Sequence, residues 1–237
     1  SAVFPELVAD SIWQVAPETV LKGTMSCDPN GNACLSSALM NMDLSKYDSL
    51  VVGPGIGIYS EDWQKSIDYL LGFEGLLILD ADALNRISES KIGPKFFLER
   101  KSKTWITPHS IEFERLFPNI KCENNVELVL NAAKEFNISV LLKGANSIVA
   151  DNKKAWQLFG TDSQTARAGL GDLLSGFVAG SAAIDLTFCK NITTDFFAKY
   201  VLLHSFAASK SKIGSNASAI GDELSKLMRN RKTRQIS

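Results

Sequence analysis

The sequence predicts an α/β protein in which a mainly parallel β-sheet lies between two layers of helices, a three-layer αβα sandwich. Short runs that are apolar throughout alternate with longer amphipathic stretches, and strands without polar residues are typical of sheets covered on both faces. Glycines or polar residues follow each of the first four runs. Parallel strands end at a common edge, where such sheets bind ligands, so these clusters are expected to form one site.

The strands are predicted from these apolar runs, and each one is short. After the fourth run, a turn at Asp151-Asn152 joins two short stretches into a hairpin-like pair. The predicted strands cover residues 50–52, 76–79, 104–106, 140–142, 147–150 and 155–158.

The helices are predicted from apolar residues at helical spacing. The first covers residues 60–71 and has Glu61 and Asp62 in its first turn. Another follows Asn125, where the apolar residues of 126–136 fall on one face. Three more helices are predicted towards the end of the chain, starting at Gly171, Thr194 and Ser218.

Composition excludes several classes of partner. A formal net charge of -1 gives no electrostatic basis for binding nucleic acid or an anionic membrane surface. No apolar run approaches the length of a membrane span, and no signal-peptide pattern opens the chain. We therefore expect a cytoplasmic protein without nucleic-acid or membrane partners. Four scattered cysteines, without metal-site spacing, are expected to be reduced thiols.

Three small residues, Ala168, Gly169 and Gly171, lie directly before Asp172 and an apolar helix. Small residues let backbone N–H groups approach an anion, and a helix N-terminus adds a positive partial charge. An acid at that place suggests a base, or the partner of a cation, beside a reacting phosphate. The alternative is a tight loop in which Asp172 is only the N-cap of the helix.

Two more clusters follow the first two strands. Gly53-Pro54-Gly55-Ile56-Gly57 exposes backbone that a phosphate or a sugar could approach, although a simple strand-to-helix turn fits as well. Asp80 and Asp82 could face a cation-bound phosphate. The alternative for these acids is a solvated turn in which Asp82 caps the next helix.

The third and fourth strands end in one histidine and one lysine of interest. His109 could hydrogen-bond a substrate and Glu112 could hold a metal-bound water, or both could belong to a surface turn with a capping glutamate. Lys143 could neutralise a nucleotide phosphate while the backbone of 144–147 follows the nucleotide, or it could be a surface lysine before a turn. The other histidine, His204, lies in an apolar helix and is expected to be packed there.

Taken in order, five motifs resemble those of the ribokinase-like NAD(P)H-hydrate dehydratases. The resemblance covers roughly residues 50–228, and the order of the motifs is more specific than any one of them. The motifs are GPGIG (53–57), LDADALN (79–85), TPHSIEFERL (107–116), LLKGANSIVA (141–150) and ARAGLGDLLSGFVAG (166–180).

The resemblance implies a repair reaction on nicotinamide nucleotides. Such enzymes take the S form of NADH or NADPH hydrated at C6 and restore the dinucleotide, using ADP or ATP with Mg²⁺. Asp172 would deprotonate the 6-hydroxyl, which would then receive the terminal phosphoryl group. Phosphate would leave as the ring nitrogen expels it. The TPH form of the third motif resembles bacterial members, which favour ADP.

The resemblance also implies roles for individual residues. Gly55 and His109, together with Asp172, would contact the hydrate. Glu112 and Asp80 would act on the metal ion through water. The adenine nucleotide would be held by Lys143, Gly144, Ala145, Asn146, Ser147, Gly169 and Gly171.

Two departures from the family pattern shape further expectations. The family loop reads A-x-G-G-S/T-G-D, whereas Ala168 and Leu170 stand here in place of a glycine and a hydroxyl residue. Leu170 therefore removes one possible phosphate donor. The family also begins with a strand and a glycine loop that we do not find upstream of Ala16. We expect residues 1–237 to form a single ribokinase-like domain that lacks this strand and loop.

Other functions and partners are consistent with the same motifs. One alternative is a small-molecule kinase of the same fold, acting on a thiazole or pyrimidine alcohol. Another is a non-catalytic protein that binds an adenine nucleotide, which the altered loop would favour. By resemblance we also expect a homo-oligomer, and a fused or separate NAD(P)H-hydrate epimerase as partner.

Overall fold

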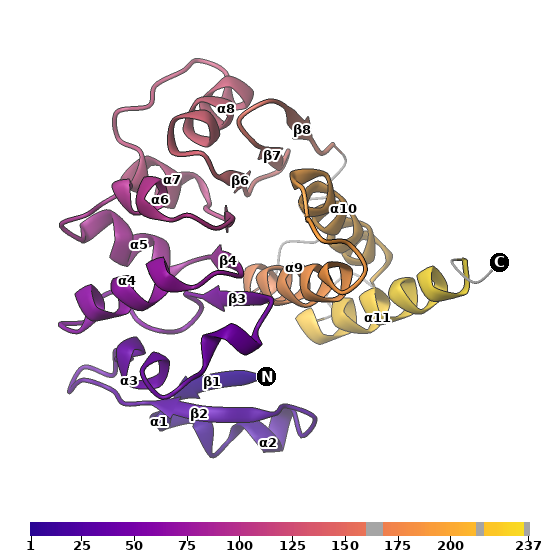
Figure 1. The fold of residues 1–237 in the computed structure, drawn as a ribbon. Helices are drawn as coiled ribbons and strands as arrows, with labels where there is room; N and C mark the ends of the chain where they lie inside the picture. Colours follow the sequence, from indigo (N-terminus) through magenta and orange to yellow (C-terminus); the bar gives the residue numbers. More distant parts are fainter. Residues whose placement is uncertain (160–167, 212–215, 235–237) are drawn as a thin grey trace.

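A six-stranded sheet forms the centre of the computed structural model, which describes residues 1–159, 168–211 and 216–234, with side chains up to 229 (Figure 1). Each strand pairs with its neighbours in sequence. The first four strands run parallel, and the last two add an antiparallel hairpin, which confirms the predicted sheet. The strands are β3 (Ser49–Val52), β4 (Leu76–Leu79), β5 (Thr104–Ile106), β6 (Ser139–Leu142), β7 (Ile148–Ala150) and β8 (Ala155–Gln157).

Alternate residues of each strand face two different hydrophobic cores. In β4, Leu77 and Leu79 belong to one core, whereas Leu76 and Ile78 belong to the other. In the neighbouring β5, Ile106 and Trp105 divide in the same way. Because side chains alternate across a strand, a sheet with no polar face needs a helical layer on each side. The three-layer prediction is therefore confirmed.

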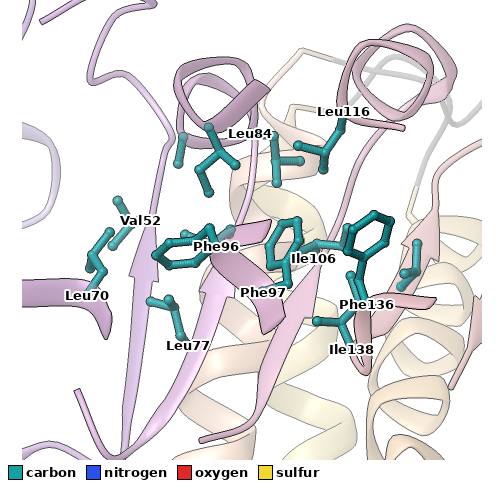
Figure 2. Close-up of a cluster of buried hydrophobic side chains, with 14 of the residues drawn as sticks. Val52, Leu70, Leu77, Leu84, Phe96, Phe97, Ile106, Leu116, Phe136 and Ile138 are labelled. Atoms are coloured by element: carbon teal, nitrogen blue, oxygen red, sulfur yellow. The ribbon is translucent and has the colours of Figure 1, made fainter. Parts of the chain in front are cut away.

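The first layer consists of the helices that connect the parallel strands. Because the strand order never reverses and parallel crossovers are right-handed, these connections fall on one face of the sheet. Their core is rich in phenylalanine, and Phe97 contacts both Phe96 and Phe136 (Figure 2). The helices are α4 (Trp63–Gly72), α5 (Asp82–Glu89), α6 (Lys95–Glu99), α7 (Ser110–Leu116) and α8 (Asn125–Phe136).

The second layer covers the opposite face with α9 (Leu170–Leu186) and α10 (Thr194–Lys210), and α11 (Ala217–Arg234) packs against both helices (Figure 1). Trp105 of the sheet stacks on Phe197 of α10, with ring centroids 4.6 Å apart and planes inclined by 3°. Ser49 Oγ donates a hydrogen bond of 2.9 Å to the carbonyl of Ala179 in α9. These contacts fix α9 over the first strands, which sets the position of its N-terminus.

The first 48 residues form elements that the sequence pattern did not indicate. A parallel two-stranded sheet pairs β1 (Ala2–Pro5) with β2 (Leu21–Met25). Met25, Leu35 and Leu39 belong to the same core as the first helical layer. The segment is thereby joined to the large sheet. Its helices are α1 (Glu6–Ala9), α2 (Ile12–Val15), α3 (Leu35–Leu39) and a 3-10 turn, η1 (Leu44–Lys46).

Several helix starts differ by one to three residues from those considered in the sequence, and α11 begins at Ala217 instead of Ser218. Asp62 is the N-cap of α4, and its carboxylate accepts from the backbone N–H of Ser36, so Glu61 and Asp62 precede the first turn. Asp82 is the first residue of α5 and not its N-cap, which is Ala81. Helix α9 begins at Leu170, because Gly169 adopts a φ of +79° that glycine tolerates, and Asp172 lies in the first turn.

Other expectations of the sequence are met in the described residues. His204 is buried in α10, as predicted. All four cysteines carry free thiols. Within the described ranges, no helix combines the length and the apolar character needed to cross a bilayer.

Candidate active site

Residues from three of the predicted clusters meet at the carboxyl edge of the sheet. Lys143, just after β6, places its Nζ 2.7 Å from Oδ1 of Asp80, just after β4. A methyl group at Gly171 would lie 3.6 Å from the same Nζ and 3.9 Å from Asp80 Oδ2. A cation, a buried carboxylate and the first turn of α9 are thus neighbours. The prediction that strand-end clusters meet is confirmed for Asp80 and Lys143.

A sharp strand-to-helix turn fixes the two acids that follow β4. Ala81, between them, has φ 48° and ψ -122°, a region that residues with a Cβ rarely adopt. Its backbone N–H donates to Asp80 Oδ1 at 2.8 Å. The turn directs Asp80 towards Lys143 and leaves Asp82 to accept from the backbone N–H of Gly57 at 2.9 Å.

The glycine loop after β3 is held tightly against α5. Gly53 has φ +136°, and a Cβ there would lie 1.7 Å from the carbonyl oxygen of Asp80, so only glycine fits. Gly57 has φ +77° and packs against Asn32. Gly55, by contrast, is exposed, has φ +69° and has open space where a Cβ would stand. The loop therefore presents Gly55 at its surface, whereas Gly53 and Gly57 on either side of it are tightly packed.

Arg86 of α5 holds this loop through its carbonyl oxygens. The side chain is 2% exposed, and Nε donates to Gly57 O at 2.7 Å, while Nη2 donates to Ile56 O and to Tyr59 O. Nη1 reaches the carbonyl of Ala33 at 3.0 Å. Burial lowers the pKa of Arg86, although nearby carboxylates oppose the effect. Asp82 and Arg86, one helical turn apart, thus hold the loop by its N–H and its C=O groups.

His109 and Glu112 form a reciprocal cap at the start of α7. Nδ1 of His109 accepts from the backbone N–H groups of Ile111 and Glu112, and Glu112 Oε2 accepts from the backbone N–H of His109 at 2.8 Å. His109 Nε2 lies 3.3 Å from Glu112 Oε1. Because Nδ1 accepts, the neutral ring carries its proton on Nε2. The half-exposed ring is therefore held in one orientation, as the capping alternative predicted.

The segment that follows β6 lies beside this cap. The backbone N–H of Lys143 donates to Pro108 O at 2.8 Å, which pairs the His109 and Lys143 segments. Residues 144–147 form a turn in which Ser147 Oγ bonds both the N–H and the C=O of Gly144. Asp172 and Gly169 are exposed at the start of α9. Ala166 and Arg167 of the last motif lie outside the described residues.

A magnesium ion would find few protein ligands here. The described residues contain no group of three His, Cys, Asp or Glu side chains placed to hold a metal. Asp80 Oδ1 already accepts from Lys143 and from Ala81, and both oxygens of Glu112 contact His109. Direct ligation by Glu112 does not fit this arrangement, and these bonds leave Asp80 only its Oδ2 to offer to a metal. A metal carried on the phosphates of a nucleotide, and reached through water, fits better.

Comparison with known proteins assigns the family. A family model described as NAD(P)H-hydrate dehydratase matches residues 11–227. The chain belongs to the NAD(P)H-hydrate dehydratase family. It is 35% identical over 168 residues to the bifunctional NAD(P)H-hydrate repair enzyme Nnr of Synechocystis, a match that covers 70% of this chain and 30% of that enzyme. The chain thus spans about a third of the length of this bifunctional relative.

Two crystal structures support the fold of this dehydratase-family chain. The ADP/ATP-dependent NAD(P)H-hydrate dehydratase of Bacillus subtilis, co-crystallised with ATP/Mg²⁺, has a TM-score of 0.69 at 20% identity, covering 95% of this chain and 76% of that one. A ribokinase-like superfamily protein of Enterococcus faecalis has a TM-score of 0.73 at 21% identity, covering 96% and 75%. The ribokinase-like fold is therefore confirmed.

Sequence reasoning missed Arg86 in this dehydratase-family site. A signal was present, because Arg86 shares a helix face with Ala83 and Ile87, which are both buried. A charged side chain inside an apolar stripe needs buried hydrogen-bond partners. Those partners lie 27 to 53 residues earlier in the chain, so the pattern within α5 does not identify them.

A hollow of about 360 Å³ lies away from the dehydratase motifs. Its lining includes Thr104 and Ser139, the first residues of β5 and β6, and Thr194, the first residue of α10. It therefore opens at the amino edge of the sheet. None of the predicted site residues lines it. The two edges of the sheet are thus structurally distinct, and only the carboxyl edge gathers the motifs.

Proposed function

We propose that this chain dehydrates the S form of NADH or NADPH hydrate with ADP or ATP as phosphoryl donor, a repair of nicotinamide nucleotides. The observation that supports it most directly is the meeting of Lys143, Asp80 and Gly171 at the first turn of α9, with Asp172 one residue further on. A lysine and a helix N-terminus attract phosphate, and the exposed carboxylate is placed to accept a proton beside it.

The chemistry proposed for Asp172 is kinase-like in its first half. Its carboxylate accepts the proton of the 6-hydroxyl as that oxygen bonds to the terminal phosphorus and the P–O bond to the nucleotide breaks. The ring nitrogen then expels phosphate from C6 to give an iminium ion, and transfer of the C5 proton to water restores the double bond of the reduced nicotinamide. Hydroxide is a poor leaving group and phosphate a good one, so phosphoryl transfer precedes elimination.

The other site residues bind and orient in this proposal. Gly55 and His109 contact the hydrate: the loop is held by Arg86, and the imidazole is fixed by Glu112. Lys143, Gly169, Gly171 and the turn 144–147 bind the nucleotide. Mg²⁺, arriving on the nucleotide, would neutralise phosphate charge, with Glu112 reaching it only through water.

A direct assay tests the dehydratase proposal. The protein is incubated with Mg²⁺, ADP or ATP and the S form of NADH hydrate, and the absorbance of reduced nicotinamide is followed. We expect a nucleotide-dependent rise that Asp172→Asn abolishes. Asp195→Asn is a matched control, because Asp195 lies in the first turn of the equally long α10 and pairs only with surface groups.

Two other outcomes of this assay are informative. Phosphorylated product without release of phosphate would indicate a small-molecule kinase of the same fold. ADP binding without any turnover would indicate a non-catalytic nucleotide-binding protein, the function favoured by Leu170, which lacks the hydroxyl group of the family pattern. Either result would contradict the proposed dehydratase.

We further propose a homo-oligomer and an epimerase partner for this chain. Leu202 and Phe206 of α10 are about half exposed, and Phe188 is 82% exposed, which leaves apolar surface for a second copy. The bifunctional relative is about three times longer than its match to this chain, so an epimerase could be fused or separate. Light scattering would give the mass in solution, and a monomer at micromolar concentration would contradict the proposed homo-oligomer.

We also propose that residues 1–237 act as one domain in the cytoplasm.

A further inference from the structure

We propose that Asp80 is a positioning residue that holds the Lys143 ammonium group beside the N-terminus of α9, where it meets a nucleotide phosphate. This inference rests on the proposed nucleotide binding at this edge. It gives Asp80 a role through a neighbouring side chain in place of a role on the metal ion.

The carboxylate of Asp80 is fixed in its place. Its side chain is 1% exposed, and Oδ1 accepts both the Lys143 ammonium group at 2.7 Å and the backbone N–H of Ala81 at 2.8 Å. Burial and these two bonds leave the group little freedom to rotate. A buried carboxylate that already bonds a cation and an amide is suited to orient that cation.

The lysine depends on this carboxylate for its direction. Asp80 follows β4 and Lys143 follows β6, with β5 between them, so the side chain crosses one strand. Neighbouring strands lie about 4.8 Å apart, so β4 and β6 are separated by roughly 10 Å. The Lys143 side chain must be extended to cross this distance. Side chains of this length otherwise sample many rotamers at a strand end. With 23% of its side chain exposed, Lys143 would swing into solvent if the carboxylate were removed.

The ammonium group keeps donors for a phosphate in this arrangement. An ammonium group has three N–H donors, and Asp80 occupies one of them. Its position near Gly171 adds the field of the α9 N-terminus, since a methyl group there would lie 3.6 Å from Nζ. Glycine at position 171 also keeps this space open to a ligand. The pair therefore leaves a directed cation at the helix end.

A double-mutant cycle on ADP binding tests the inference. Dissociation constants for ADP with Mg²⁺ are measured by calorimetry for the wild type, Asp80→Ala, Lys143→Met and the double variant. We expect each single change to weaken ADP binding roughly tenfold, as for the loss of a charge-assisted hydrogen bond. Asp80→Ala should have no further effect once Lys143 is methionine. Independent, multiplying effects would overturn the proposal.

An isosteric variant and a control guard against misfolding. Asp80→Asn keeps an acceptor for Lys143 and should hold ADP affinity within about threefold of the wild type. Tighter binding in Asp80→Asn would show that the carboxylate acts by cancelling charge, which contradicts positioning. Asp185→Asn is the control, because Asp185 of α9 is also a buried carboxylate and accepts a hydrogen bond of 2.5 Å from Tyr200. This variant should leave ADP affinity unchanged.

Kinetics separate this inference from the dehydratase proposal. Asp80→Ala should raise the KM for ADP about tenfold and leave the KM for the hydrate unchanged. A raised Mg²⁺ requirement that persists in the Lys143→Met background would make Asp80 a metal-site residue and overturn the inference. If the wild type binds ADP without turnover, the dehydratase proposal fails while the cycle still decides the role of Asp80. If it binds no ADP, the inference fails as well.

Discussion

Arg86 and Arg100 are both buried, and both donate to backbone carbonyl oxygens where a carboxylate partner would be usual. Arg86 lies at the carboxyl edge and binds the glycine loop that presents Gly55. Arg100 lies at the amino edge, where it binds Phe73 O at 2.6 Å, Gly75 O at 2.7 Å and Thr104 Oγ1 at 2.9 Å. The same chemistry therefore shapes the glycine loop at one edge and joins α4 to the sheet at the other.

The difference between the edges lies in what each arginine holds. Burial lowers the pKa of Arg100 to about 10, so it stays charged at neutral pH, and burial lowers the pKa of Arg86 as well. A buried guanidinium is costly unless its donors are satisfied; carbonyl oxygens accept from both arginines, and the Thr104 hydroxyl also accepts from Arg100. The stability of the fold should therefore depend on both arginines. Of the two, only Arg86 should also affect activity.

The largest expected effect comes from replacing each arginine by lysine. Lysine keeps the charge but loses the planar fork, so buried carbonyl oxygens lose donors and each variant should lose roughly 3 kcal/mol of stability. Only Arg86→Lys should also lower kcat/KM for the hydrate, by at least about tenfold. Urea unfolding and steady-state kinetics on the folded fraction measure the two effects. An equal loss of activity in Arg100→Lys would break the comparison.

The pH dependence of stability gives the next largest effect. His204 Nε2 is buried without a hydrogen-bond partner among the described residues, and burial lowers its pKa from 6.5 to about 4. The folded state thus favours the neutral ring. This stabilisation is complete above pH 6.5 and is lost as the pH falls towards 4, roughly 2 kcal/mol by pH 5.

The variant His204→Leu should remove this part of the acid sensitivity and change neither guanidinium. Unfolding free energies at pH 7 and pH 5 measure the change in the wild type and the variant. The acid-induced loss should affect both edges together if the chain unfolds as one unit. An unchanged pH dependence in His204→Leu would show that other groups cause the acid sensitivity.

A smaller effect distinguishes two glycines of the loop that Arg86 holds. Gly57→Ala would place a methyl group 2.2 Å from Asn32 Oδ1 at a φ of +77°, and should cost about 2 kcal/mol. Gly55→Ala meets open space at a φ of +69° and should cost only about 1 kcal/mol. We nevertheless expect Gly55→Ala to raise the KM for the hydrate several-fold. An unchanged KM would show that Gly55 does not contact the substrate.

The smallest effect concerns one strained residue near each edge. Ala81 lies at the carboxyl edge with φ 48° and ψ -122°, and Asn137 precedes β6 at the amino edge with φ 52° and ψ 46°. Asparagine tolerates the left-handed region well. Ala81→Gly should therefore gain up to about 1 kcal/mol in thermal unfolding, whereas Asn137→Gly should be nearly neutral. A destabilised Ala81→Gly would contradict strain at this turn.

The sequence predicted the sheet better than it predicted the segments around it. Strands such as β4 are apolar throughout, and this pattern follows from burial on both faces. The N-terminal helices were not predicted because α1 and α2 span only four residues each, too few for a helical period to be recognised. Their apolar side chains, such as Leu7 and Val15, are largely exposed, so hydrophobicity there does not report burial.

The candidate site was predictable where it follows strand ends. Asp80 and Lys143 meet because parallel strands bring their carboxyl ends to one edge. The direct bond between them was not predictable, since it depends on the turn at Ala81. Arg86 was missed for a related reason, because its partners are backbone atoms of distant residues and leave no mark in the side-chain pattern.

The unbroken strand order has a consequence for how this chain emerges from the ribosome. Each strand from β4 to β8 can pair with the strand made just before it, so one face of the sheet is covered by its own connecting helices as synthesis proceeds. The opposite face, with Trp105 and Leu141, is covered only when α9 and α10 follow. At roughly 5–20 residues per second, that apolar face waits for seconds in the nascent chain. The helix that carries Asp172 is therefore also the first to cover this face, and its synthesis starts to protect the growing chain from aggregation.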